Sequence, residues 1–144
     1  MGIIKDYQSR VNPGIAQRTR VALTSAQILA LNTTPITVIG APGANKYISI
    51  DEILVLAPAS GATAYTGANA VEVRYTNASG VKATGDIAAA TLNSVTGQVD
   101  KTIAAAVTGV VVNAPVVVAV PVANPGAGTG TVTLDILYRV VGLQ

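Results

Sequence analysis

Along most of this chain, apolar and polar residues alternate with a period of two, or apolar β-branched residues run together, as they do in half-buried and fully buried β-strands. Clusters of Gly, Pro, Asn and Ser interrupt these segments about every ten residues, which is the spacing of turns in all-β domains. The pattern predicts an all-β fold, an antiparallel β-sandwich or jelly roll of about eight strands. The predicted strands are 20–24, 36–39, 46–56, 71–76, 81–84, 103–112, 116–122 and 131–141.

The longest alternating segment, 46–56, contains an irregularity. Ile50 and Ile53 lie on the same face of a strand only if the chain shifts by one position at Asp51 and Glu52. An extra residue in one strand of a pair produces such a shift, so the pattern predicts a β-bulge there.

Two short helices are predicted between strands, each beginning at a residue that caps a helix by accepting a backbone N–H hydrogen bond. Ser25 is the predicted cap of a helical turn over 26–31, and Asp86 is the predicted cap of a helix over 87–92. The strand at 71–76 carries a polar residue at every second position, which predicts that one of its faces is exposed to water.

The composition removes most catalytic chemistry. The chain has no His and no Cys, so it lacks the usual proton-transfer side chain, the thiol nucleophile and the commonest metal ligands. The carboxylates are scattered, and the adjacent Asp51 and Glu52 point to opposite faces of a strand, which separates them. The glycine-rich segments 40–46 and 126–130 fail the spacing of nucleotide-binding loops. We therefore expect that the protein is not an enzyme and has no catalytic residue, cofactor, metal site or small-molecule substrate. The enzyme alternative is a glycan hydrolase, for which loss of activity in a Glu72→Gln variant would be the test.

Charge is sparse and unevenly distributed. Only 11% of the 144 residues are charged, against roughly 25% in a typical soluble domain, and the net charge of +2 is too small to indicate nucleic-acid binding. Segment 1–20 is basic, has too few apolar residues for a core, and is interrupted by Pro13. We predict an extended basic N-terminal arm, 1–20, that docks on an acidic partner, followed by a β-sandwich domain, 21–144; a frayed terminus is the alternative. The expected contact residues of the arm are Ile3, Ile4, Lys5, Tyr7, Arg10, Val11, Ile15, Arg18 and Arg20.

An uncharged apolar stretch, 102–134, is the candidate for a membrane span. Pro115 and Pro121 interrupt it and many of its residues are Val, so two buried strands are the better prediction. No secretory signal precedes the first charges, and we expect no membrane partner. The part at 110–122 is too long an apolar run for one face of a small sandwich to hide, which predicts an oligomer.

Four segments, taken in their order and spacing, resemble a widespread group of small virion proteins of tailed bacteriophages. They are 21–35 (VALTSAQILALNTTP), 38–47 (VIGAPGANKY), 113–120 (NAPVVVAV) and 124–140 (NPGAGTGTVTLDILYRV). Members of this group resemble capsid decoration, or cement, proteins, which are β-sandwich subunits that form trimers on the outside of an icosahedral shell. The resemblance implies a structural protein of the capsid exterior, made in the cytoplasm of the host bacterium, that forms a homotrimer and binds the major capsid protein.

The alternative within the same setting is a fibre, spike or tail-associated protein. In that case the exposed loops predicted at 57–67 and 124–130 would contact the host surface. The resemblance implies no catalytic residue in either case.

Overall fold

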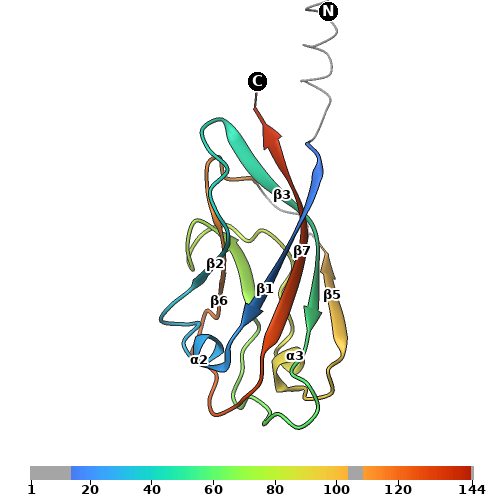
Figure 1. The fold of residues 1–144 in the computed structure, drawn as a ribbon. Coiled ribbons are helices and arrows are strands. Elements are labelled where there is room, and N and C mark those ends of the chain that lie inside the picture. The colour runs from blue at the N-terminus through green and yellow to red at the C-terminus, as the bar shows by residue number, and fades with distance from the viewer. Residues whose placement is uncertain (1–13, 104–108, 144) are drawn as a thin grey trace, which may run out of the picture.

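The computed structural model describes residues 14–103 and 109–143. Within these residues the chain forms seven strands and two short helices (Figure 1). The strands are β1 (Ala16–Leu23), β2 (Ile36–Ile39), β3 (Lys46–Leu56), β4 (Glu72–Tyr75), β5 (Val99–Ile103), β6 (Val116–Ala119) and β7 (Val132–Gly142). The helices are α2 (Ser25–Ile28) and α3 (Ala89–Asn93). No helix in this part of the chain is long and apolar enough to cross a membrane.

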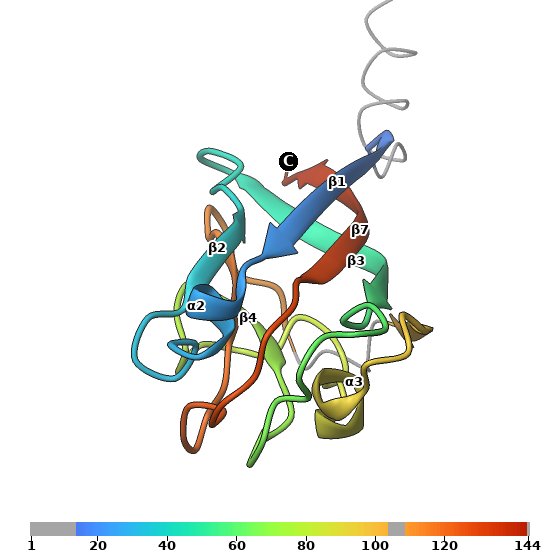
Figure 2. The ribbon, with the colours of Figure 1, turned by 60° about the horizontal axis from the view of Figure 1, so that its bottom comes forward.

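Two antiparallel sheets pack face to face (Figures 1 and 2). The larger has the strand order β1-β7-β3-β5 and the smaller the order β2-β6-β4. Alternate side chains of both sheets meet in one apolar core, to which the larger sheet contributes Ile53 and Ile136 and the smaller contributes Val73 and Val118. The all-β class and the two antiparallel sheets predicted from the sequence are confirmed, and the jelly-roll connection stays a prediction.

A buried hydrogen bond joins the two sheets. The hydroxyl of Tyr75 in β4 donates to the carbonyl oxygen of Ile48 in β3 at 2.7 Å. Burial raises the pKa of Tyr75, so this hydroxyl keeps its proton and its donor role. The bond fixes the two layers relative to each other, in addition to the apolar packing between them.

The predictions of a long strand over 46–56 and of a β-bulge within it are confirmed. β3 spans Lys46–Leu56, and its register with β7 shifts between Ile50 and Glu52. The shift keeps Ile50 and Ile53 on the buried face, which is the physical reason that the apolar pattern revealed it. β2 likewise spans the predicted residues, Ile36–Ile39.

The apolar run 110–122 is largely enclosed by the chain itself. Strand β6 is the central strand of the smaller sheet, and all of its residues, Val116–Ala119, are buried, as is Val120. Contrary to the prediction, no other subunit is needed to hide the residues at the centre of this run, and the oligomer itself stays a prediction. Val110, Val112 and Val122 remain exposed.

Both predicted helix caps are wrong. α2 is capped by Thr24, whose hydroxyl accepts from the backbone N–H of Gln27 while the Gln27 side chain accepts from the backbone N–H of Thr24. This reciprocal capping box satisfies two backbone donors at once, which a cap at Ser25 would not. Asp86 binds Lys82 instead of capping a helix, and α3 begins only at Ala89.

The strand expected at 103–112 is displaced. β5 ends at Ile103, residues 109–112 are not in a strand, and the prediction for 104–108 lies outside the described residues. The segment 81–84 forms no named strand and meets β4 only through the isolated bridge between Arg74 and Lys82. Continuous apolar runs carry little register information, so strand ends are poorly fixed by them.

The β-sheet begins five residues before the boundary predicted between arm and domain. β1 starts at Ala16 and pairs in register with β7 as far as Leu23. In this strand Val21 and Leu23 face the core while Arg18 and Arg20 face outward. The alternation is that of a half-buried strand, and pairing with β7 satisfies its backbone groups.

Candidate protein-binding face

The outward side of the larger sheet gathers charged and apolar side chains from all four strands. One row across it consists of Arg20 in β1, Asp135 in β7, Leu54 in β3 and Lys101 in β5, because these residues pair in register. We call this surface the outer sheet face. Its members are Arg18, Arg20, Glu52, Leu54, Leu56, Val99, Lys101, Thr133, Asp135 and Leu137.

Ion pairs cross this face from its edge strands to its central strands. Arg18 binds Asp135 in bidentate geometry, with both N–O distances at 2.5 Å, and Lys101 binds Glu52 at 2.6 Å. The Arg18 hydrogen bonds hold the pKa of Asp135 below its ordinary value. Arg20 reaches the same carboxylate only at 3.8 Å. Asp135 is thus neutralised mainly by Arg18, and Arg20 retains most of its capacity to bind another anion.

The cations of the outer sheet face are more exposed than its anions. The side chains of Arg18 and Arg20 are 65% and 69% exposed, whereas that of Asp135 is 11% exposed. Lys101 and Glu52 show the same order, at 56% and 29%. A molecule that approaches this face therefore meets guanidinium and ammonium groups before it meets carboxylates.

Apolar side chains lie between these charges. Leu56 and Val99 pair in register and are 36% and 60% exposed. Two shallow depressions of about 130 and 150 Å³ lie on the face, and both are lined by Arg18, Leu54 and Asp135. Depressions of this size are smaller than ligand pockets, whereas a flat face of apolar and charged groups suits contact with a protein.

The structure brings together only some of the residues predicted for the arm. Arg18 and Arg20 lie on the outer sheet face, and Ile15, directly before β1, is 80% exposed. The predictions for Ile3, Ile4, Lys5, Tyr7, Arg10 and Val11 lie outside the described residues. Leu54, Val99 and Lys101 were not predicted as site residues, because only strand register reveals that they adjoin the arginines.

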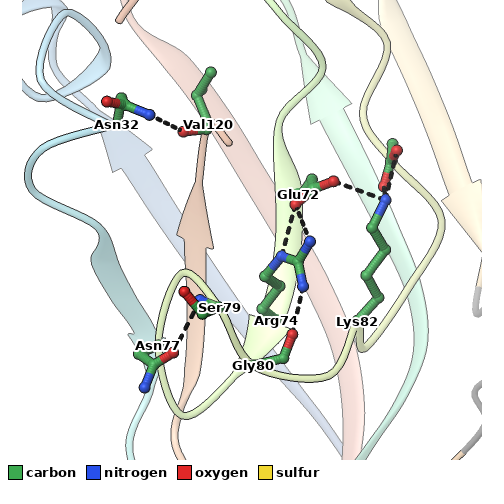
Figure 3. Close-up of polar contacts among 9 residues, drawn as sticks. Asn32, Glu72, Arg74, Asn77, Ser79, Gly80, Lys82 and Val120 are labelled. Atoms are coloured by element: carbon green, nitrogen blue, oxygen red, sulfur yellow. Dashed lines mark hydrogen bonds and ion pairs between the residues drawn. The ribbon is translucent and has the colours of Figure 1, made fainter. Parts of the chain in front are cut away.

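A second polar cluster, on the smaller sheet, has a structural role (Figure 3). Glu72 is 7% exposed and accepts from Arg74 at 2.6 Å, and its other oxygen lies 2.7 Å from the Lys82 ammonium. Arg74 also donates to the carbonyl oxygen of Gly80, and Lys82 binds Asp86 at 2.8 Å. The cluster fastens the segment 76–86 to β4. The prediction of a water-exposed face at 71–76 is therefore wrong for Glu72.

The electrostatics of Glu72 fit this role. Burial acts to raise its pKa, but the hydrogen bonds from Lys82 and Arg74 outweigh burial, and the pKa lies below its ordinary value. Glu72 is therefore ionised at neutral pH, with both oxygens engaged by cations.

Within residues 14–103 and 109–143 no group of three or more Asp or Glu residues lies close enough together to hold a metal ion. Comparison with known proteins gives no match to a family model, a curated protein or a solved structure. The chemistry that the outer sheet face offers is non-covalent: bidentate binding of carboxylates by arginine, together with apolar contact.

Proposed function

We propose that this protein is a structural virion protein, a decoration or cement protein that binds the outside of a bacteriophage capsid and stabilises the head. The sequence resemblance described above supports the phage setting. The single structural observation that supports attachment is the outer sheet face, where the exposed arginines of β1 adjoin the apolar side chains of Leu54, Leu56 and Val99. Its partner is an acidic surface of the major capsid protein, and its working form is a homotrimer on the capsid exterior.

The proposed action is mechanical. A subunit that bridges two neighbouring capsomers has to be detached from one of them before they can separate. A two-layer sandwich transmits that load well, since its long antiparallel pairs β1–β7 and β3–β7 resist shear along many backbone hydrogen bonds. The buried Tyr75 hydroxyl that joins the layers adds to this rigidity.

The test is binding of the purified protein to heads that lack it. Co-sedimentation should show saturable binding, and decorated heads should rupture at a higher temperature than bare heads. Heads of an unrelated phage are the control. Absence of binding to the matching heads would overturn the proposal.

One observation favours the alternative, a fibre, spike or tail-associated protein that contacts the host. The loops 57–67 and 124–130 are joined by backbone hydrogen bonds, among them Thr66 N–H to the carbonyl of Ala127 at 3.0 Å and Thr129 N–H to that of Thr63 at 2.9 Å. Tyr65 of the first loop is buried, and its hydroxyl donates to the carbonyl oxygen of Gly130 in the second loop at 2.6 Å. The paired loops form one defined surface. Immunogold labelling of virions would distinguish a head location from a tail location.

A further inference from the structure

A pocket of about 370 Å³ lies between β5, α3 and the segment that precedes α3. Its apolar lining includes Val55, Ile87 and Ala90, and its polar lining includes Thr91, Gln98 and Asp100. It lies at the side of the sandwich formed by the edge strand β5, away from the Arg18 edge. The proposed attachment to a capsid makes no use of it.

Asp100 is held in place in this pocket by neutral donors. The Thr91 hydroxyl donates to Oδ2 at 2.5 Å, and the Gln98 amide lies 3.2 and 3.1 Å from Oδ1 and Oδ2. These hydrogen bonds, that from Thr91 first, lower the pKa of Asp100. The carboxylate is therefore charged at neutral pH and fixed in orientation.

Asp100 differs from the other acids in the part of the chain that the structure describes. Each of the others forms an ion pair, whereas Asp100 has no cationic partner there; the paired acids are Asp51, Glu52, Glu72, Asp86 and Asp135. The adjoining segment 104–108 contains no basic residue. A carboxylate fixed by neutral groups and lining a pocket presents negative charge that its neighbours leave uncompensated.

We propose that this pocket binds an ammonium or guanidinium group carried on an alkyl stem. The carboxylate oxygens of Asp100 pair with the cation through the lone pairs that do not accept hydrogen bonds from Thr91 or Gln98. Val55, Ile87 and Ala90 contact the methylene groups of the stem, as apolar surface does around lysine and arginine side chains. Two other charged residues line the pocket, and both are already paired: Lys101 with Glu52 at 2.6 Å, and Asp86 with Lys82 at 2.8 Å.

The stem has two possible sources, a free organic amine and a lysine or arginine side chain of a partner protein. Two probes distinguish these sources. One is n-butylammonium, and the other is a lysine blocked at its α-amino and α-carboxyl groups, which leaves the side-chain ammonium free. Equal binding of the two indicates a site for a partner's side chain. Binding of n-butylammonium alone indicates a site that admits only a free amine.

The experiment is a titration of the ¹⁵N-labelled full chain, followed by amide chemical shifts. We expect n-butylammonium to shift the amides of Thr91, Gln98 and Asp100 with a dissociation constant on the order of millimolar, the range for such a small ligand. The neutral analogue n-butanol should bind at least tenfold more weakly. Equal shifts with n-butylammonium and n-butanol, or no shift at these amides, would overturn the proposal.

Two variants make the test specific. Asp100→Asn keeps the shape and removes the charge, and it should weaken binding about tenfold, the effect of losing a charge-assisted bond. Ala90→Leu narrows the pocket without touching the carboxylate, and it should also weaken binding, which keeps the test valid if Asp100→Asn fails to fold. Asp51→Asn, which removes a carboxylate that is paired with Arg139, is the matched control and should bind as the parent does. Unchanged binding in Ala90→Leu and in folded Asp100→Asn would place the cation elsewhere.

Discussion

Arg18 in β1 and Asp135 in β7 form a bidentate ion pair, with both N–O distances at 2.5 Å, on the outward side of the larger sheet. The pair joins an edge strand to the strand next to it. Arg20, two residues further along β1, has only a 3.8 Å contact with the same carboxylate. The two arginines therefore have different roles. Arg18 stabilises the sheet edge, whereas Arg20 keeps most of its donor groups available, as the proposed attachment requires.

Arg20 and Val99 provide the direct test of the outer sheet face. Both are well exposed, so replacing Arg20 with Gln and Val99 with Thr removes a charge and a methyl group with little effect on folding. Affinity for heads should fall roughly tenfold, and its dependence on salt should become weaker, since one ionic contact is lost. Co-sedimentation over a range of salt concentrations measures both effects.

The matched control removes one positive charge and one valine methyl group elsewhere. Lys46→Gln with Val122→Thr changes an exposed cation and an exposed valine outside the outer sheet face. This double variant should bind heads as the parent does. Equal losses in the two double variants would show that net charge alone, and not the outer sheet face, governs attachment.

The Glu72 cluster predicts a dependence of stability on pH. The pKa of Glu72 is lower in the folded chain than its ordinary value of 4.5. Its contribution to stability is therefore present above pH 4.5 and is lost as the pH falls through the folded-state pKa. Glu72→Gln should destabilise the protein by about 2 kcal/mol at neutral pH, because Arg74 loses its charged acceptor.

Urea unfolding at a series of pH values measures this effect. The difference in stability between the parent and Glu72→Gln should shrink in acid, because the parent loses the charged interaction there as well. Asp51→Asn, at a more exposed ion pair with Arg139, should change stability by less than about 1 kcal/mol. A constant difference for Glu72→Gln across the range would contradict an ionic role for this carboxylate.

The sequence predicted those features that depend on local alternation. The bulge in β3 was predictable because Ile50 and Ile53, an odd number of residues apart, are both apolar. In a regular strand they would lie on opposite faces, since successive side chains alternate. The valine-rich run gave no such information about where β5 ends. The outer sheet face could not be predicted from the sequence either. Leu54 and Val99 are apolar like core residues, and only the pairing of distant strands shows that they lie on the outward side of the sheet.

Gly80 tests how tightly the segment 76–86 is folded onto β4. A Cβ atom at this position would lie 1.7 Å from the carbonyl oxygen of Tyr75, so Ala cannot fit without a backbone shift. Gly80→Ala should therefore destabilise the protein by about 3 kcal/mol, in the range of severe packing defects. Gly40→Ala is the control, because no atom lies within 4 Å of the added Cβ. Equal shifts of the unfolding temperature in the two variants would show that the close approach at Gly80 is absent in solution.

A truncation series separates the proposed arm from the strand that follows it. Deleting residues 2–13 leaves β1 complete, whereas deleting residues 2–20 removes Arg18, Arg20 and more than half of β1. The shorter deletion should leave the stability to urea unchanged, since that segment has too few apolar residues to contribute a core. The longer deletion should destabilise the sandwich, because β7 loses a paired neighbour and Asp135 loses its cation.

Attachment to heads then reports on the arm itself. If Lys5 and Arg10 pair with carboxylates of the shell, deletion of residues 2–13 should weaken binding, and this loss should diminish as salt rises because salt already screens these pairs in the full chain. Arg20→Gln within the same deletion should weaken binding further, since the outer sheet face contributes separately. Binding by the 2–13 deletion as tight as that of the full chain would mean that attachment depends on the folded domain alone.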